Sequence, residues 1–354
     1  MASSLRRVDK LTITFLVDNN IEWMTKLPPG FTHELMQHVP HSKVDELTGV
    51  PTLDFDHFCC GAHGFAALIE TSVGNEPPEL TLFDTGPDTL SLPRNIRAME
   101  VGPDRITRVI TSHWHSDHTG GLLAFLRLRS PSSNSSPCIV DVHPDRPDAR
   151  GIAPGPTFDK VACALPRDPT LVEIAEAGGT VEQHAEGHAV AGGTVWVSGE
   201  IPRVTEFEAG LRGGMRFKDG KWVHEPHIMD ERYAAIDVAG RGLVLFSSCS
   251  HAGIVNVVKD AVTTFKRPVH MIVGGLHLAG PEFALRIPQT VDFLADRLRP
   301  SPTYILPMHC TGFQAKIALE KALGEGCVPA GVGHKVNIVG SRTDEEMLFA
   351  PVWT

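Results

Sequence analysis

Basic residues and long apolar runs are scarce in this sequence. Its 354 residues include 32 Lys and Arg against 42 Asp and Glu, a formal net charge of −10. Because binding to a phosphate backbone needs a basic surface, we expect no nucleic-acid partner. No segment approaches the roughly 18 consecutive apolar residues of a membrane span, and residues 1–11 lack the apolar core of a secretory signal. We therefore expect a cytoplasmic protein that acts on a small-molecule substrate away from membranes; a homodimer is left open.

Cysteine and tyrosine are also sparse. The seven cysteines are odd in number and include no C-x-x-C pair, which excludes a disulfide framework and a zinc ribbon. Only two tyrosines are present, against 18 histidines. The histidines gather in short motifs, and the chemistry of the protein is sought there.

Short apolar runs rich in Val, Ile, Leu, Thr and Phe recur along the chain and predict strands. These runs cover residues 11–17, 65–71, 80–84, 108–112, 138–142, 194–198, 233–238, 243–247, 269–273 and 304–308. Segments with helical spacing lie between them, at residues 92–99, 120–128, 252–265, 282–298 and 314–323. This order is typical of a layered α/β protein whose sheets carry helices outside.

No internal repeat and no linker divides the chain, so a single domain over residues 1–354 is expected. Three stretches rich in Pro, Gly, Asp, Ser or Arg are irregular: residues 130–137, 144–169 and 210–226. The first is predicted to be a surface loop. The other two are long enough to be loop insertions near a functional site.

The sharpest motif is an H-x-H-x-D-H pattern directly after the predicted strand at residues 108–112. It comprises His113, His115, Asp117 and His118. Two histidines that are two residues apart point to the same side of an extended backbone, while the Asp-His pair lies on the turn before a helix beginning near residue 119. Imidazole nitrogens and a carboxylate are zinc ligands, so the motif predicts a metal site with room for two ions.

The sequence resembles the metallo-β-lactamase superfamily through this motif and the preceding segment Leu82-Phe-Asp-Thr-Gly86. Further matches resemble the branch named after the dihydropterin ribofuranosylaminobenzene phosphate synthase of methanogens. They are Phe15-Leu-Val-Asp-Asn19, His63-Gly64, Ser198-Gly-Glu-Ile-Pro-Arg203, Ser248-Cys-Ser-His-Ala-Gly-Ile254, Gly274-Gly-Leu-His-Leu278 and Pro307-Met-His-Cys-Thr-Gly312. The resemblance implies a four-layer αβ/βα sandwich of two mixed sheets with outer helices. It also implies one or two metal ions at the sheet edges.

Two departures from the family pattern stand out. The superfamily usually supplies a bridging Asp after its third metal histidine, whereas the matching region here ends in Gly274-Gly-Leu-His277 without a carboxylate. We expect His277 to take the place of that Asp, in contact with the metal centre directly or through water. The branch also tends to have Glu before the histidine numbered His63, where this chain has Ala62.

Two later histidines complete the predicted ligand set. His251 and His309 each follow an apolar strand, which places their rings at a sheet edge. A histidine at a strand end is often only structural, but the motif demands partners from elsewhere in the chain. We predict one ion held by His113, His115 and His251 and another held by Asp117, His118 and His309. His184 and His188, in a polar run, remain an alternative source of the third ligand.

Other residues are expected around the ligands. Asp84 is implied by the resemblance to orient a ligating histidine, with a turn-capping role as the alternative. His63 is expected beside the ligands or the substrate. Glu200 and Arg203 are expected to form an ion pair that shapes the pocket or meets a substrate anion. Cys249 and Cys310 flank proposed ligands, and either metal ligation or burial as a small residue is open for both.

This constellation predicts a metallo-hydrolase. Three histidines and an open position convert bound water to hydroxide near neutral pH, and a second ion can share it. We expect a binuclear zinc centre, with Mn²⁺ or Fe²⁺ as alternatives, whose metal-bound hydroxide cleaves an ester, lactone or thioester. Asp117 would orient the nucleophile or move its proton, and His277 is a candidate to protonate the leaving group. No Gly-rich phosphate cradle is present, which disfavours a highly charged phosphate substrate.

Other functions stay open. The branch's namesake chemistry predicts a synthase-like transferase that joins a pterin to an arylamine ribophosphate, and a phosphoesterase is a related alternative. A mononuclear iron redox enzyme of the same fold would keep the motif, although His115 argues against the flavodiiron type, which carries Glu there. A non-catalytic metal-binding protein is the last alternative, but inactive members of the superfamily usually lose ligands.

Overall fold

Two mixed β-sheets form the centre of the computed structural model, which describes residues 5–129 and 137–354. The larger sheet has eight strands in the order β2-β19-β1-β3-β4-β5-β6-β9. Their bounds are β1 Lys10–Val17, β2 Phe31–Thr32, β3 Ala66–Ser72, β4 Glu79–Phe83, β5 Arg108–Ile110, β6 Cys138–Val142, β9 Gly179–Gln183 and β19 Lys335–Val339. From β2 to β4 neighbouring strands are antiparallel, and from β4 to β9 they are parallel.

The second sheet has six strands in the order β10-β11-β14-β15-β16-β18. Their bounds are β10 His188–Val190, β11 Val195–Val197, β14 Ala234–Val238, β15 Gly242–Phe246, β16 Val269–Gly275 and β18 Tyr304–Met308. Here the first four strands are antiparallel and the last three are parallel. Each of the ten predicted strands overlaps a strand of these two sheets, so the predicted strands are confirmed.

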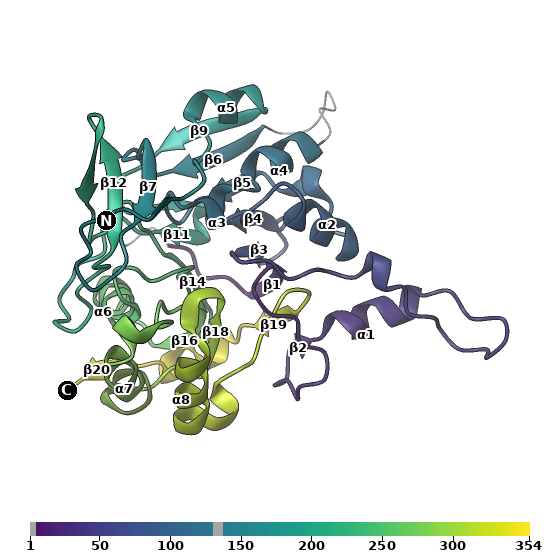
Figure 1. Cartoon of the computed structure of the whole chain (residues 1–354). Coiled ribbons are helices and arrows are strands. Elements are labelled where there is room, and N and C mark those ends of the chain that lie inside the picture. Colours follow the sequence, from purple (N-terminus) through teal and green to yellow (C-terminus); the bar gives the residue numbers. More distant parts are fainter. Residues whose placement is uncertain (1–4, 130–136) are drawn as a thin grey trace.

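Helices cover the outer face of each sheet, as Figure 1 shows. The helix bounds are α1 Glu34–His38, α2 Ser91–Ala98, α3 Ser116–Thr119, α4 Leu122–Leu128, α5 Leu171–Glu176, α6 Ile254–Phe265, α7 Arg286–Asp292 and α8 Phe313–Leu323. Helices α2, α4 and α5 pack on the eight-stranded sheet, and α6, α7 and α8 on the six-stranded sheet. The layers are therefore helix, sheet, sheet, helix, and the predicted four-layer αβ/βα sandwich is confirmed.

The core has three large clusters because both faces of each sheet are buried. Phe15 and Ile69 of the larger sheet meet Phe246 and Val273 of the smaller sheet in the middle of the sandwich. On the outer faces, one cluster joins the larger sheet to Ile96, Phe125 and Ile174, and another joins the smaller sheet to Val258, Leu294 and Leu319. Burial of both faces explains the nearly continuous apolar runs of the strands.

The two segments predicted to be loop insertions, at 144–169 and 210–226, are more regular than expected. They pair with each other in a small sheet with the strand order β13-β12-β7-β8. Its strands are β7 Ala149–Ile152, β8 Cys163–Ala164, β12 Gly214–Lys218 and β13 Lys221–His224. A two-stranded sheet joins β17 Leu298–Arg299 to β20 Val352–Trp353. The predicted loop at 130–137 lies, except for its last residue, outside the described residues.

Two predicted helices differ from the structure. The single helix predicted over 282–298 is a short turn at Pro281–Phe283, then α7, then a π-helical turn over Phe293–Arg297. The helix expected from residue 119 is divided into α3 and α4. Of the helices within the described ranges, α6 is the longest at 12 residues, and none of them is long and apolar enough to cross a bilayer.

Candidate metal centre

The H-x-H-x-D-H motif lies where parallel strands of the larger sheet end. His113 and His115 follow β5, and Asp117 and His118 belong to the single turn of α3. His251 and His309 come from the other sheet, after β15 and β18. Because the carboxyl ends of parallel strands meet at one edge of a sheet, side chains distant in sequence converge there.

Three histidine rings form the first group of candidate ligands. The Nε2 atom of His113 lies 2.9 Å from Nδ1 of His115 and 3.1 Å from Nε2 of His251. The remaining pair, Nδ1 of His115 and Nε2 of His251, is also 3.1 Å apart. A tetrahedral zinc ion with 2.0–2.1 Å bonds needs ligand nitrogens roughly 3.3 Å apart, and this triangle approaches that spacing.

The three rings are held in their neutral form. Burial lowers the pKa of His115 to about 3 and lowers the pKa of His113 and of His251 well below the ordinary value. A neutral imidazole keeps a lone pair on one nitrogen, which is the form that binds metal. The first group therefore has both the geometry and the protonation state of a metal-binding triad.

Asp117, His118 and His309 form the second group, which Cys249 joins. The Oδ2 atom of Asp117 lies 3.6 Å from Nε2 of His118 and 3.3 Å from Nε2 of His309. The Sγ atom of Cys249 lies 3.2 Å from Nε2 of His118. A carboxylate, two imidazoles and a thiol thus surround one point.

The charges of this second group are coupled. Burial alone would raise the pKa of Asp117, but His118 and His309 outweigh it and hold that pKa well below its ordinary value. Burial would likewise lower the pKa of His118, yet the carboxylates of Asp117 and Asp84 raise it to about 9. The pocket therefore stabilises positive charge beside Asp117, which a metal cation would supply in place of the proton.

Asp84 orients one of the candidate ligands. Its Oδ2 lies 2.9 Å from Nδ1 of His118, and its Oδ1 accepts a hydrogen bond of 2.7 Å from the Ser112 backbone N–H. A hydrogen bond to Nδ1 leaves Nε2 of His118 free for a metal. Asp84 therefore makes the contact that the orienting role implied by the resemblance requires, and the role itself stays a prediction.

Hydrogen bonds to carboxylates and an amide also position His251 and His309. The carboxylate of Glu231 accepts from the backbone N–H groups of His251 and Ala252. Asp18 accepts from the His309 backbone N–H at 2.8 Å, and Oδ1 of Asn19 lies 3.0 Å from His309 Nδ1. Glu231 lies in no motif of the sequence, whereas Asp18 and Asn19 belong to the matched segment Phe15-Leu-Val-Asp-Asn19, for which no role was predicted.

The residues present fit metal ions. The Nδ1 of His251, the Nδ1 of His277 and the Nε2 of His309 are buried and make no hydrogen bond. A buried polar atom that makes no hydrogen bond costs folding free energy. A cation bound by Asp117, His118 and His309 would remove this cost for His309 Nε2. Both predicted triads are brought together by the fold, and their role as ligands stays a prediction.

His277 and His63 lie at the margin of the centre. The His277 ring is 4.5 Å from the ring of His251, and the donors grouped with it are the thiols of Cys249 and Cys310. His63 is largely exposed, with Nε2 3.6 Å from Oδ2 of Asp117. His63 is thus beside the ligands as predicted, and contact of His277 with a metal stays a prediction.

The alternative third ligands lie elsewhere. Nε2 of His188 is 2.8 Å from the Asp141 carboxylate, and the His184 ring stacks on His188 at 3.9 Å. Asp141 is also paired with Arg232 and Arg108. His184 and His188 therefore belong to a separate cluster, and His251 is the histidine that completes the first triad.

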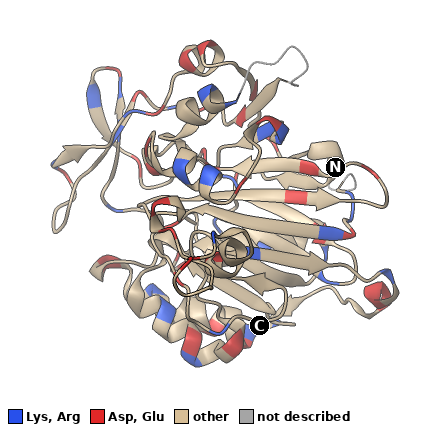
Figure 2. Cartoon of the chain, turned by 90° about the vertical axis from the view of Figure 1, so that its right-hand side faces the viewer, with Lys and Arg blue, Asp and Glu red and all other residues tan. Residues whose placement is uncertain are grey.

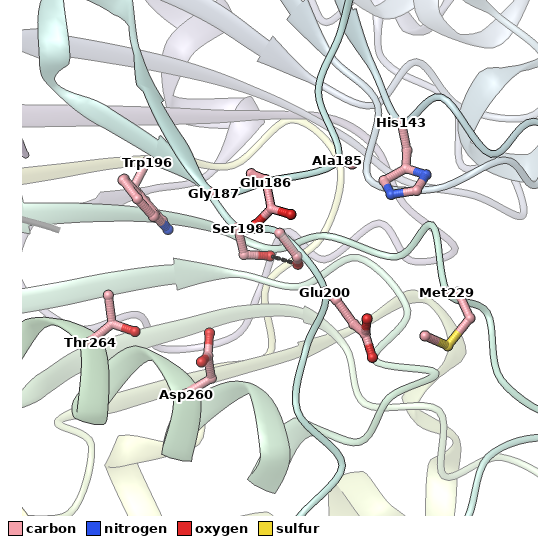
Figure 3. Close-up of a pocket in the computed structure, with 11 residues that line it drawn as sticks. His143, Ala185, Glu186, Gly187, Trp196, Ser198, Glu200, Met229, Asp260 and Thr264 are labelled. Atoms are coloured by element: carbon pink, nitrogen blue, oxygen red, sulfur yellow. Dashed lines mark hydrogen bonds between the residues drawn. The ribbon is translucent and has the colours of Figure 1, made fainter. Parts of the chain in front are cut away.

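The expected ion pair between Glu200 and Arg203 is wrong. Arg203 donates to the carbonyl of Ile228 and to Sδ of Met229. Glu200 is exposed on the wall of a separate pocket, together with His143 and Met229 (Figure 3). The Ile-Pro sequence between the two residues separates their side chains, and neither lines the cavity above the histidines.

A cavity of about 900 Å³ opens onto the candidate metal centre. Four members of the two predicted triads line it, namely His115, Asp117, His251 and His309, and so do Cys249 and His277. Six large apolar side chains from the small sheet and neighbouring loops also line it and are called its apolar wall: Ile152, Phe158, Leu165, Leu211, Met215 and Ile228. Arg150 is the single Lys or Arg among the described residues of this lining, and Glu225 and Asp230 pair with it.

The model of the metallo-beta-lactamase superfamily matches residues 62–204 of the chain. A curated protein of Methanocaldococcus jannaschii is 30% identical over 259 residues, which cover 72% of this chain and 82% of that protein. Its name is 7,8-dihydropterin-6-methyl-4-(beta-D-ribofuranosyl)-aminobenzene-5'-phosphate synthase. An uncharacterized protein of the same organism is 28% identical over 262 residues, or 73% of this chain and 88% of that protein.

A solved structure shares the fold over nearly the whole chain. Tm1679, described as a metal-dependent hydrolase of the beta-lactamase superfamily, superposes with a TM-score of 0.65. The match covers 93% of this chain and 99% of that chain at 20% sequence identity. At this level of identity, the likeness concerns the fold.

Proposed function

Because this chain belongs to the metallo-beta-lactamase superfamily, we propose that it is a metal-dependent hydrolase of an uncharged carboxylic ester, lactone or thioester. We propose two zinc ions, one held by His113, His115 and His251 and the other by Asp117, His118 and His309. One observation carries the proposal: residues of both donor groups line the same largely apolar cavity. When bound, such ions activate water and polarise a scissile carbonyl, which is the chemistry of hydrolysis.

Asp117 has a role besides ligation in this proposal. Its carboxylate lines the cavity. In the metal-free protein, burial alone would raise its pKa, but His118 and His309 hold that pKa well below the ordinary value, and metal cations beside the carboxylate would likewise favour its ionised form. An ionised carboxylate at this place accepts a hydrogen bond from an attacking water and receives its proton. His63, 3.6 Å from Asp117 and exposed, connects that carboxylate with solvent.

The cavity wall favours a substrate with an apolar group next to the scissile bond. The six apolar side chains of the wall would bury such a group, at roughly 0.8 kcal/mol for each CH₂ taken out of water. Arg150 is already bound to Glu225 and Asp230, so the described lining offers a phosphate no free Lys or Arg besides the proposed metal ions. We therefore favour an acyl or aromatic ester over a phosphorylated substrate.

The relative's name supports a second candidate function. A synthase-like transferase would act on a phosphorylated aminobenzene compound, as the name of the 30% identical protein indicates. The two candidates differ in the charge of the substrate. Hydrolysis of an uncharged ester and turnover of a phosphorylated arylamine are therefore to be assayed side by side.

The proposal is tested by metal analysis followed by a substrate panel. Protein purified without added metal should contain close to two equivalents of zinc, and iron alone would favour the redox alternative. The panel compares acyl esters of increasing chain length, lactones and thioesters with a phosphodiester that has the same leaving group. We expect kcat/KM to rise with acyl length, and faster phosphodiester cleavage would overturn the substrate class.

A cavity variant makes the test specific. Phe158→Ala should raise KM for the longer esters more than for acetate, because it removes apolar contact area from the wall. Val172→Ala, an exposed position on α5, is the matched control. Equal effects of chain length in both variants would show that the wall does not bind the acyl group.

A further inference from the structure

Cys249 is the residue that the two donor groups share. Its Sγ lies within 4.8 Å of the donor atoms of Asp117, His118 and His309, and also of those of His113 and His251. The side chain is buried, with an exposed fraction of 3%. Within the described residues, this sulfur therefore belongs both to the group with His113 and His251 and to the group with Asp117, His118 and His309.

The turn that carries Cys249 is held rigidly. Ser248 accepts a backbone hydrogen bond from Gly275 and donates through its hydroxyl to Ser112, beside the H-x-H-x-D-H motif. Ser250, at a positive φ of 59°, donates its hydroxyl to the Gly275 carbonyl at 2.7 Å. These contacts fasten the turn after β15 to both sheets and fix the direction of the thiol.

We propose that the Cys249 thiolate is a shared ligand that bridges the two metal ions. A second observation supports it. The Nε2 atom of His309, a residue 95% buried, makes no hydrogen bond, lies 3.3 Å from Oδ2 of Asp117 and belongs to the same donor group as Cys249 Sγ. The assignment concerns the metal centre on which the proposed hydrolysis depends.

Charge favours a thiolate at this place. Two divalent ions held by five histidines and Asp117 would carry a single ligand carboxylate, which leaves the centre strongly positive. A thiolate adds one negative charge and has several lone pairs, so one sulfur binds two ions, whereas an imidazole nitrogen binds one. Metal coordination deprotonates a thiol outright, so a thiol buried in the absence of metal is compatible with ligation.

His277 and Cys310 are less suited to this position. His277 packs on the outer side of His251 and against the Phe283 ring, with centroid distances of 4.5 and 5.0 Å. Cys310 Sγ lies 3.6 Å from Cys249 Sγ, but the donors grouped with it are Cys249 and His277. Cys310 is therefore a matched control, a neighbouring thiol outside both triads.

A sulfur ligand also bears on metal identity. Thiolates favour zinc over magnesium, calcium and manganese, which prefer oxygen ligands. The proposal thus favours Zn²⁺ over Mn²⁺ in the purified protein and predicts tight binding of Cd²⁺. A centre bridged by a carboxylate would discriminate less strongly between zinc and manganese.

The test reads the metal–sulfur bond directly. Protein loaded with Co²⁺ should show near-ultraviolet sulfur-to-cobalt charge-transfer absorption, and Cys310→Ser should retain it. Cys249→Ser and Cys249→Asp should both lose the band. Cys249→Asp should still bind two equivalents because the carboxylate restores the bridging charge, whereas Cys249→Ser should bind metal roughly 10–100-fold more weakly. The folding of each variant is checked by circular dichroism.

X-ray absorption of the zinc form distinguishes a shared ligand from a terminal one. A bridging thiolate gives about one sulfur per zinc at about 2.3 Å, and a thiolate on one of two ions gives about half a sulfur per zinc. Two bound ions without sulfur, or a band that disappears in Cys310→Ser alone, would overturn the bridging assignment and leave the proposed hydrolysis intact. A chain that binds no metal ion would overturn both.

Discussion

At the scale of single residues, Asp117 is the side chain with the largest expected effect on turnover. In Asp117→Asn the amide neither balances metal charge nor accepts a proton, so the fold should persist while kcat falls by about 10²–10⁴-fold. The measurement is ester hydrolysis at saturating substrate, with circular dichroism to check folding. Asp296→Asn, at an exposed position, is the control. Parent-like turnover in Asp117→Asn would remove Asp117 from the reaction.

Asp84 should act through His118. In Asp84→Asn the amide cannot accept all the hydrogen bonds that the carboxylate accepts from His118 Nδ1, the Ser112 hydroxyl and the Ser112 backbone N–H. We expect metal affinity at the Asp117-containing group to fall roughly 10–100-fold while the first triad keeps its ion. Competition with a chelator, followed by counting of the zinc that remains, measures this. Loss of both ions together would contradict an effect limited to His118.

The sequence predicted the candidate ligands better than their supports. Spacing alone predicted that His113, His115, Asp117 and His118 act in one site, because these four donors lie within six residues. Glu231 could not be found in this way, since it reaches His251 from another loop and lies in no motif. Cys249 lay in a motif, but its position between the two triads depends on how both sheets meet.

At the scale of elements, the start of α6 is under close steric constraint. Gly253 has a φ of +98°, and a Cβ there would lie 2.1 Å from the Glu208 carboxyl carbon. Gly253→Ala should therefore destabilise the protein by more than the roughly 1–3 kcal/mol that a sparsely populated backbone conformation alone costs an L-residue. Gly178→Ala, at φ +93° in open space, isolates that cost. Equal free energies of unfolding for the two variants would exclude the steric effect.

Glu208 should link stability to pH. Burial raises the pKa of Glu208 to about 7. Its carboxylate accepts hydrogen bonds from the backbone N–H groups of Val255 and Asn256, which lower the pKa, but burial has the larger effect. The folded state therefore holds this proton more tightly than the unfolded chain. Protonated Glu208 therefore contributes to the free energy of unfolding. This contribution, on the order of 3 kcal/mol, is complete below the ordinary Glu pKa and is lost as pH rises through about 7.

Urea unfolding of the metal-free protein between pH 4.5 and 8 measures this linkage. The stability advantage of the parent over Glu208→Gln should shrink as pH rises, because the glutamine does not ionise. Glu206→Gln, at an exposed neighbouring position, should run parallel to the parent. A constant difference between Glu208→Gln and parent at every pH would contradict the prediction.

Elements buried on both faces were the ones the sequence predicted well. Strands such as β14 and β15 are wholly buried and largely apolar, so their signal is strong. The small sheet has short, half-exposed strands such as β12, whose apolar and basic residues are mixed. The helix predicted from 282 starts four residues later because Pro288 lacks an N–H and is tolerated only in a first turn.

At the scale of the whole molecule, the layer order was predictable and the cavity was not. The order of apolar strands and helices predicted a layered α/β protein with helices outside, and the resemblance to the superfamily implied the two sheets. The cavity wall depends on pairing between residues 149–152 and 214–218, which are far apart in sequence and have weak strand signals. Acidic and basic residues are interspersed along the ribbon in Figure 2, and overall charge therefore did not indicate where the site lies.

The candidate metal centre joins the two sheets. His113, His115, Asp117 and His118 follow the larger sheet, whereas His251 and His309 follow the smaller one. Bound ions would therefore connect the halves of the sandwich, and their removal should destabilise the whole fold. At a free metal concentration 100 times Kd, the expected stabilisation is about 2.7 kcal/mol per ion.

Thermal unfolding with and without a chelator tests this connection. The metal-free protein should melt several degrees lower in one cooperative transition, because ligands from both sheets lose their common partner. His309→Ala should melt low in either condition and respond less to added zinc than the parent does. His57→Ala, at a side chain that is 80% exposed and outside the donor groups, should respond to zinc like the parent. A parent that melts at the same temperature in both conditions would show that no ion couples the two sheets.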